Sequence, residues 1–281
     1  MEVSSMANSD LKTRQYILDH MIAAVDATEV CNDPSPHIVT KGFFPDDVYA
    51  DILSQLPEEE LYLANSEKHH TQNGYMNRKS FTFISKFLNK LPRSQAQLWY
   101  DIRGVLGSVD LKEGVYQKLR DALAFRFDSD PSSNDTFPGF AEPGLFRETE
   151  GYKIKPHPDT RRKVVTMQVA LPKDDSQIGL GTEFYRRSLK MTSWKWESLG
   201  FETVKTMPFL PNTCFAFVVL NTRKIKSWHG RSTLPEGSGV RNTILNIWYA
   251  KTEDANLEII AEQAAQKKSR QGTRSALTKA A

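Results

Sequence analysis

The second half of the chain is composed of short β-rich segments separated by turn residues, and this texture constrains the fold more than any other feature. Segments rich in β-branched and aromatic residues, which predict strands, occur at 164–171, 182–185, 213–219 and 243–250. Residues 124–128 alternate between apolar and polar and predict a further strand. Residues 130–144 are rich in Pro, Gly, Ser and Asn and indicate a loop. We therefore expect a sheet-rich core from about residue 124 to about residue 250.

The first half of the chain has the apolar spacing of helices. After a loose start over residues 1–9, residues 10–28 predict an amphipathic helix. Residues 37–44 predict a strand. Pro45 and two aspartates follow it and predict a helix that runs through Leu56, because proline and acids are favoured in a first turn. We expect further helices near 93–107, 112–123 and 256–266.

The tripeptide His157-Pro158-Asp159 is the strongest chemical signal. On an extended strand, side chains at i and i+2 point to the same side, so an imidazole and a carboxylate here can bind one metal ion. A second imidazole from elsewhere in the chain would complete two histidines and one carboxylate. That set leaves open positions and suits a non-haem Fe(II) that activates oxygen.

His229 is the best candidate for the third ligand because Arg241 follows it by twelve residues, an interval that fits a strand, a turn and a returning strand. A guanidinium binds a carboxylate bidentately and keeps its charge, so Arg241 suits an anionic co-substrate. Thr243 lies two residues further on the same face and offers a hydroxyl donor.

The order of these motifs resembles a known superfamily. A glycine-aromatic strand leads into His-x-Asp, then come a Gly-x-x-Phe strand, a Pro-Asn turn into an apolar strand, a histidine and Gly-x-Arg, all within residues 140–250. The pattern resembles the 2-oxoglutarate- and Fe(II)-dependent oxygenases, on the prolyl-hydroxylase-like side.

The resemblance implies that His157, Asp159 and His229 bind Fe(II) as the catalytic centre, that Arg241 and Thr243 bind 2-oxoglutarate, and that O2 is the second co-substrate. It also implies a mainly β fold with supporting helices (α+β), built on a double-stranded β-helix, a jelly-roll or cupin-like core. Residues 1–123 would form an N-terminal helical and strand support layer, residues 124–250 the catalytic core, and residues 251–281 a helix and a basic flexible tail, in one domain overall.

The implied reaction is hydroxylation of an unactivated C–H bond, with release of succinate and CO2. A carboxylate at position 159 fills the metal position that iron halogenases leave for a halide, so halogenation is disfavoured. Desaturation, ring closure and epimerisation would use the same ligands and stay open. We expect a small polar metabolite as substrate, either amino-acid-like or an intermediate of specialised metabolism. A hydroxylase of protein or peptide side chains and a non-enzymatic binding protein are the alternatives.

Residues that bind the primary substrate are less sharply indicated by the sequence; the candidates are Arg147, Tyr152, Trp228 and Arg231. Arg147 would equally serve in an outward salt bridge, and the aromatic residues would equally serve as core. Residues 161–163 form a basic cluster, and residues 73–79 suggest a turn and strand that contributes a substrate lid.

Each site residue also has a purely structural interpretation. His157 would lie in a proline-rich surface turn, and His229 would be a core histidine beside Trp228. Arg241 would be a surface arginine in a glycine turn. Asp159 would cap a helix starting near Thr160, although the strand pattern after residue 163 argues against that helix.

Charge and cysteine content bear on partners and compartment. The net charge is +3, but residues 267–281 hold five Lys or Arg and no acid, which leaves about −2 for the rest. The basic balance is therefore mostly a property of the tail, and we expect no nucleic-acid partner. Two cysteines make no disulfide framework. Without a secretory signal or a long apolar run, we expect a cytoplasmic protein with no membrane partner; the oligomeric state stays open.

Overall fold

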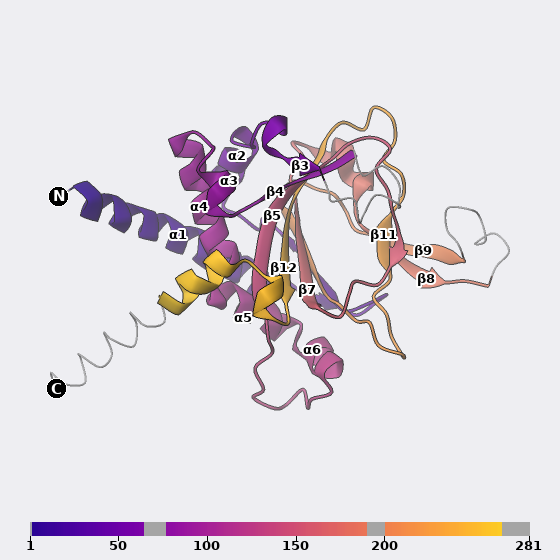
Figure 1. The fold of residues 1–281 in the computed structure, drawn as a ribbon. Coiled ribbons are helices and arrows are strands. Elements are labelled where there is room, and N and C mark those ends of the chain that lie inside the picture. Colours follow the sequence, from indigo (N-terminus) through magenta and orange to yellow (C-terminus); the bar gives the residue numbers. More distant parts are fainter. Residues whose placement is uncertain (1, 65–76, 190–199, 266–281) are drawn as a thin grey trace.

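In a computed structural model, which describes residues 2–64, 77–189 and 200–265, the chain forms two antiparallel sheets with helices packed on one of them (Figure 1). The larger sheet has the order β1-β2-β10-β7-β12-β5-β4-β3. Its strands are β1 (Val30–Cys31), β2 (His37–Lys41), β3 (Leu63–Ala64), β4 (Arg78–Thr82), β5 (Phe140–Glu148), β7 (Lys163–Ala170), β10 (Thr213–Val218) and β12 (Arg241–Tyr249). The smaller sheet has the order β6-β11-β8-β9, with β6 (Ile154–His157), β8 (Glu183–Arg187), β9 (Phe201–Thr206) and β11 (His229–Arg231).

Strands β5 to β12 are distributed over both sheets in a jelly-roll order. β5, β7, β10 and β12 lie side by side in the larger sheet, and β6, β8, β9 and β11 make up the smaller one. The chain therefore crosses from sheet to sheet several times, which is the eight-stranded double-sheet arrangement. The predicted fold class, a double-stranded β-helix with supporting helices, is confirmed.

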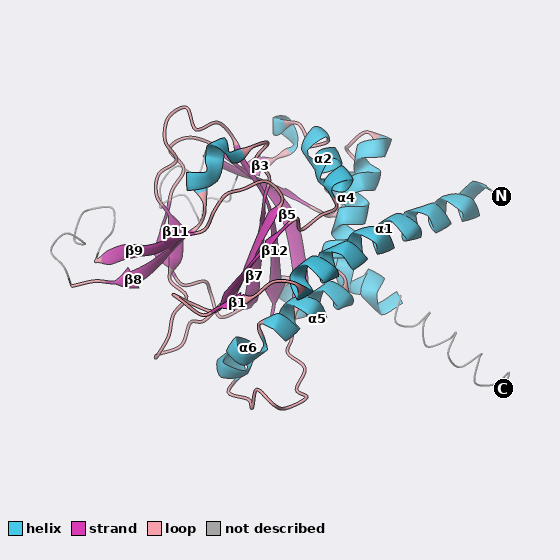
Figure 2. Ribbon diagram, turned by 180° about the vertical axis from the view of Figure 1, so that it is seen from behind, coloured by secondary structure: helices cyan, strands magenta, loops and turns pink. Residues whose placement is uncertain are grey.

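The helices cover the face of the larger sheet that points away from the smaller sheet (Figure 2). They are α1 (Glu2–Asp26), α2 (Asp46–Ser54), α3 (Ser85–Leu88), α4 (Arg93–Leu106), α5 (Val109–Lys118) and α6 (Arg120–Phe127), followed near the end of the described chain by a helix over 257–265. Single 3-10 turns occur at η1 (Glu59–Leu61), η4 (Asp175–Leu180) and η6 (Thr252–Asp254). Among the described residues, no helix carries an apolar stretch long enough to cross a membrane.

The side chains of strand β12 show that one face of the larger sheet packs against the helices and the other faces the smaller sheet. Asn246 donates from Nδ2 to the carbonyl of Leu106 at the end of α4, and the ring of Trp248 packs edge-on against Tyr116 of α5. Because alternate side chains of a strand point to opposite faces, Arg241 and Leu245 point the other way, toward the smaller sheet. The helices thus bury one face, and the space between the sheets is left for a site.

Aromatic side chains fill one part of the space between the sheets. Phe184 of the smaller sheet packs edge-on against Phe215 and Phe217 of β10, with ring centroids 5.6 and 5.7 Å apart. These edge-to-face contacts stabilise the sandwich beyond the burial of apolar area alone. The cluster packs the larger sheet against β8, and Phe217 extends it to the ring of His229 at 4.8 Å.

Three sequence predictions were wrong. Residues 124–128 are not a strand, because residues up to Phe127 belong to α6, where Ala122, Leu123 and Ala124 are buried. A five-residue alternation is too short to outweigh packing of an apolar helical face. The single helix expected at 112–123 is two helices that meet at Leu119, whose backbone departs from helical angles. Residues 2–9, expected to be loose, belong to α1.

The other predicted elements are present with boundaries shifted by a few residues. The strand expected at 37–44 ends at Lys41, and the helix expected to run through Leu56 ends at Ser54. The lid expected at 73–79 lies largely outside the described residues, as does the basic tail at 267–281.

Asn212 connects the start of β10 to the segment between β2 and α2. Its Oδ1 accepts from the backbone N–H of Phe44 and its Nδ2 donates to the carbonyl of Phe44, both at 2.8 Å. The residue is buried and has φ of 50°, which asparagine tolerates better than most residues. This is the Pro-Asn turn of the sequence motif, and its side chain fixes the entry into a central strand.

We predict that Asn212→Ala lowers the free energy of unfolding by about 3 kcal/mol, because two buried hydrogen bonds are lost and alanine is strained at positive φ. Asn212→Gly loses the same bonds but not the strain, and should cost about 1 kcal/mol less. Urea unfolding measures both. Equal stability of Asn212→Ala and the parent would contradict the role of this turn.

Candidate active site

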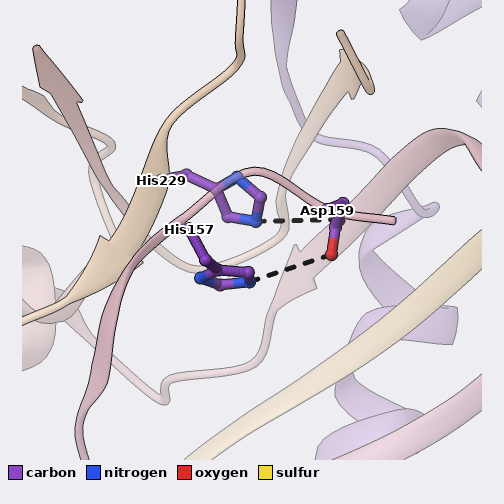
Figure 3. A group of neighbouring side chains, drawn as sticks. All are labelled: His157, Asp159 and His229. Carbon is purple, nitrogen blue, oxygen red and sulfur yellow. Dashed lines mark ion pairs between the residues drawn. The ribbon is translucent and has the colours of Figure 1, made fainter. Parts of the chain in front are cut away.

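Two histidines meet across the smaller sheet. His157, at the end of β6, lies directly opposite His229, at the start of β11, and their ring centroids are 4.5 Å apart. Asp159 follows two residues after His157, and its carboxylate lies to one side of the two rings, where it faces a nitrogen of each (Figure 3). The three side chains each offer one ligand atom, and these atoms all lie within 4.8 Å of one another. The structure therefore brings together the three residues that the sequence singled out as metal ligands.

The hydrogen bonds of the two imidazoles leave Nε2 of each ring free to bind a metal. Nδ1 of His157 lies 2.9 Å from the carbonyl of Lys155, and Nδ1 of His229 lies 2.9 Å from the carbonyl of Ser227. A carbonyl only accepts, so each Nδ1 carries the proton and each Nε2 presents a lone pair. Both Nε2 atoms face Asp159, at 3.8 Å from Oδ1 for His157 and 3.6 Å from Oδ2 for His229.

The environment sets the charge of the three groups for metal binding. Burial lowers the pKa of His229 to about 4, and burial is also the main cause of the lowered pKa of His157. Burial alone would raise the pKa of Asp159, but the charges of His229 and Lys163 outweigh it and hold that pKa well below its usual range. Near pH 7 the cluster is therefore two neutral imidazoles and one carboxylate, the protonation state that binds a divalent cation.

Neighbouring residues hold Asp159 in place. Lys163 donates from Nζ to Oδ1 at 2.6 Å, and Thr166 donates from Oγ1 to Oδ2 at 3.0 Å. Asn221 donates from Nδ2 to the Asp159 backbone carbonyl at 3.0 Å. Such outer contacts orient a ligating carboxylate and limit its movement. They also rule out the interpretation of Asp159 as a helix cap.

The cluster opens into a cavity between the two sheets. Its lining residues are Arg78, Glu148, Tyr152, Ile154, His157, Asp159, Lys163, Thr166, Gln168, Thr182, Phe217, His229, Gly230, Arg231, Arg241 and Leu245. The metal-ligand cluster lies where β6 ends and β11 begins, and Arg241 lies where β12 begins beside the end of β5. A charged group at each position makes the cavity suitable for a small polar ligand with two functional ends.

Arg241, at the start of β12, lies among charged and aromatic partners in the cavity. It is 1% exposed, and it donates from Nη1 to Glu148 Oε2 at 2.6 Å and from Nε to the carbonyl of Leu180 at 2.7 Å. The ring of Phe209 covers its guanidinium, with Cζ 4.3 Å from the ring centroid. This excludes the interpretation of Arg241 as a surface residue in a glycine turn.

Three other predicted site residues lie at or near the cavity. Tyr152 and Arg231 line the cavity, and the hydroxyl of Tyr152 accepts from Nη1 of Arg78 at 2.8 Å. Thr243 is buried on the same face of β12 as Arg241, though it is not among the cavity-lining residues.

Two predicted substrate residues lie elsewhere. Trp228 packs against Phe201, with ring centroids 4.7 Å apart, and is not among the lining residues. Arg147 forms an ion pair with Glu59, 2.7 Å from Nη2 to Oε2, which is the outward salt bridge that its sequence position also allowed. The structure therefore does not bring these two together with the metal-ligand cluster.

Sequence reasoning did not name Arg78 or Glu148 as individual site residues, although Arg78 belongs to the 73–79 turn and strand that was expected to contribute a substrate lid. Nε of Arg78 lies 3.2 Å from Glu148 Oε1, and both side chains line the cavity. Arg78 belongs to β4, which precedes the jelly-roll strands and joins the sheet by pairing with β5. No local motif signals that pairing. Glu148 had a weaker signal, since it precedes His157 by nine residues within the quoted motif.

No family model matches the sequence, and no curated protein matches it. Solved structures align with most of the chain at low identity. A prolyl hydroxylase from Trichoplax adhaerens, in complex with a hypoxia-inducible-factor peptide, has a TM-score of 0.47 and 11% identity over 85% of this chain and 92% of its own. A prolyl-4-hydroxylase from Pseudomonas putida has a TM-score of 0.45 and 14% identity, over 83% of this chain and 99% of its own.

The non-haem α-ketoglutarate-dependent epimerase SnoN of nogalamycin biosynthesis also aligns, with a TM-score of 0.43 and 11% identity over 83% of this chain and 82% of its own. The solved structures that align with this chain therefore include prolyl hydroxylases and a non-haem α-ketoglutarate-dependent epimerase.

We predict that His229→Ala lowers the affinity for Fe(II) by more than about 100-fold, since loss of an outer-shell partner alone costs 10- to 100-fold. Anaerobic equilibrium dialysis with Fe(II), followed by metal analysis, measures the effect. His20→Ala is the matched control, because His20 is exposed and its Nε2 lies 2.9 Å from the carbonyl of Gly42 rather than in the cluster. Unchanged Fe(II) binding by His229→Ala would show that this cluster is not the metal site.

Proposed function

We propose that the protein is an Fe(II)- and 2-oxoglutarate-dependent dioxygenase. In this proposal it hydroxylates an unactivated C–H bond of a small polar metabolite, amino-acid-like or from specialised metabolism, and releases succinate and CO2. The observation that carries the proposal is the convergence of two neutral imidazoles and one carboxylate on one point of a cavity that also contains buried arginines.

The ligand set supports iron over other metals. Two histidines and one carboxylate on one side of a metal leave positions open for a co-substrate and for oxygen, and this set is typical of non-haem Fe(II) oxygenases. His157, Asp159 and His229 would hold the ion. A closed structural zinc site would use a fourth protein ligand, and within the described residues no further His, Cys, Asp or Glu belongs to this cluster.

The arginine part of the cavity supports an organic anion as the co-substrate. Arg241 is fully buried and keeps its charge at neutral pH, although burial lowers its pKa. A guanidinium in such surroundings attracts a carboxylate more strongly than it would in water. 2-Oxoglutarate has a metal-binding 2-oxo acid at one end and a second carboxylate at the other. Its distal carboxylate would bind at Arg241, and Thr243 of the same strand face would support that position.

The residues of this chain would bind the metal, orient the co-substrate and exclude water from the cavity. Lys163 and Thr166 hold Asp159 so that its carboxylate stays aimed at the metal-ligand cluster. Phe217 packs against His229 and, with Leu245, gives the cavity apolar walls. When bound, iron with 2-oxoglutarate and O2 supplies the oxidising chemistry, while the protein fixes orientation. The two imidazoles need to lose no proton, because they are already neutral.

Hydroxylation is the proposed outcome because Asp159 supplies a carboxylate where a halogenase leaves space for a halide. Desaturation and cyclisation would use the same three ligands, and analysis of the product distinguishes them. We also propose a cytoplasmic location. This is supported by the two free cysteines, Cys31 and Cys214, and it suits a site that needs ferrous iron.

A screen for stimulated succinate formation tests the proposal and separates the substrate classes. The Fe(II)-loaded protein is incubated with 2-oxoglutarate, O2 and either pooled polar metabolites or a peptide library. A metabolite pool that raises succinate release supports the proposed substrate class. Stimulation by peptides alone would replace it with a side-chain hydroxylase. No 2-oxoglutarate turnover under any condition would contradict the oxygenase proposal and favour a binding protein.

We predict that Arg241→Ala mainly raises the 2-oxoglutarate concentration needed for half-maximal turnover, by about 30-fold, because a charge-assisted contact to a buried carboxylate is lost. Fe(II) binding should be unchanged, because Arg241 lies away from the three ligands. Succinate formation at varied 2-oxoglutarate gives the KM, and metal analysis gives the iron content. A fall in kcat at saturation with unchanged KM would contradict the assignment.

A further inference from the structure

A cluster of three reactive groups lies outside the active site, at one edge of the sandwich. Cys31 belongs to β1, an edge strand of the larger sheet, and Lys205 belongs to β9, an edge strand of the smaller sheet. Nζ of Lys205 lies 3.4 Å from Sγ of Cys31, although 174 residues separate them in the sequence. His37 of β2 completes the cluster, with its Nε2 3.1 Å from the same Nζ. A thiol, an amine and an imidazole thus meet where the two sheets approach.

Buried contacts fix the positions of the imidazole and the amine. His37 is 0% exposed, and its ring packs against the rings of Phe184 and Phe215. Its Nδ1 lies 2.6 Å from the carbonyl of Ser35 and therefore carries a proton. Burial lowers the pKa of His37, so that near pH 7 the ring is neutral and its Nε2 accepts a hydrogen bond from Lys205. The amine is thereby held beside the sulfur.

The thiol of Cys31 is open to small reagents, and that of Cys214 is not. Cys31 is half-buried and lines a cavity together with His37, Lys41 and Lys205. Reactive cysteines lie in partly exposed, electropositive surroundings of this kind, whereas cysteines buried in apolar surroundings are inert. Cys214 is 1% exposed within β10, and burial raises the pKa of its thiol above the usual range. The two thiols should therefore differ sharply in their rate of oxidation.

We propose that Cys31 is an oxidation site, and that Lys205 captures its oxidised sulfur in a reversible sulfur–nitrogen bond. The oxidant is a peroxide. The bond ties the edge of the larger sheet to the edge of the smaller one. The three metal-ligand residues take no part in it, so this inference does not rest on the proposed function.

The first step oxidises the thiol. Hydrogen peroxide transfers one oxygen atom to Sγ of Cys31: the O–O bond breaks, an S–O bond forms, and the products are a sulfenic acid and water. Sulfur loses two electrons in this step, and the peroxide gains them.

The second step is a condensation without further oxidation. The Lys205 ammonium gives up one proton, for which Nε2 of His37 is an adjacent acceptor, and the nitrogen lone pair attacks sulfur. The S–N bond forms as the S–O bond breaks. The departing hydroxide takes a second proton from nitrogen and leaves as water. Sulfenic acids condense with backbone nitrogen in the same way.

Peroxide treatment of the full chain, followed by peptide mass spectrometry, tests the proposal. A chelator keeps the protein free of iron, so that the peroxide reacts with thiols and not with a metal. We expect a cross-linked pair of peptides that contains Cys31 and Lys205 and is lighter than their sum by two hydrogen atoms, about 2 Da. Dithiothreitol should restore the separate peptides, because a thiolate attacks this sulfur as it attacks a disulfide.

Variants of the cluster separate the two steps. Lys205→Arg keeps the positive charge but offers no free amine, so the cross-link should be lost and dimedone should label the sulfenic acid that accumulates at Cys31. Lys41→Arg is the matched control, because Lys41 lines the same cavity, and it should cross-link as the parent does. Cys31→Ser should give neither cross-link nor label, and Cys214→Ala should behave as the parent. Thermal melting of each variant before oxidation shows whether the fold persists.

Three results would overturn the inference. Oxidation of Cys31 to a sulfinic or sulfonic acid, with no link to Lys205, would exclude capture by the amine. A disulfide between the Cys31 residues of two chains as the sole product would exclude it as well. Equal oxidation of Cys31 and Cys214 would contradict the selectivity on which the site depends.

Discussion

The pairing of β6 with β11 is the contact on which the site depends. It places His157 opposite His229 although 72 residues separate them in the sequence, and it leaves Asp159 just beyond the strand end. The pairing is possible because the larger sheet, buried by helices on its outer face, supports a second, smaller sheet across the aromatic cluster. A shift of β11 by one residue would turn His229 away from His157, since neighbouring side chains on a strand point to opposite faces.

The cavity is organised by two different charge arrangements. At the metal-ligand cluster, one carboxylate faces two imidazoles that burial keeps neutral, and Lys163 balances its charge. Near the start of β12, one carboxylate lies among three guanidiniums. A cation is favoured at the first position and an anion at the second. A ligand that chelates a metal through one end and carries a carboxylate at the other complements both.

The sequence revealed the local parts of this arrangement and missed the parts that depend on distant pairing. His157, Asp159 and His229 were predictable because a short spacing and an ordered set of motifs identify them. The jelly roll was implied by the family resemblance, and the strand composition supplied enough elements for it. The strand that begins at Arg78 was expected, but its place beside the cavity was not predictable, because it depends on pairing of β4 with β5. Arg147 and Glu148 are adjacent, and strand alternation alone did not tell which one points inward. The strand expected at 124–128 was wrong because Ala124, together with the preceding Ala122 and Leu123, is buried on one face of a helix.

Anaerobic titration of the Fe(II)-loaded protein with 2-oxoglutarate, recorded as a visible spectrum, tests the central claim most directly. Iron in an open three-ligand site that is chelated by a 2-oxo acid should give a weak charge-transfer band in the visible spectrum. We predict that this band appears in the parent protein and is absent in His157→Ala. Bound iron without such a band at saturating 2-oxoglutarate would contradict it.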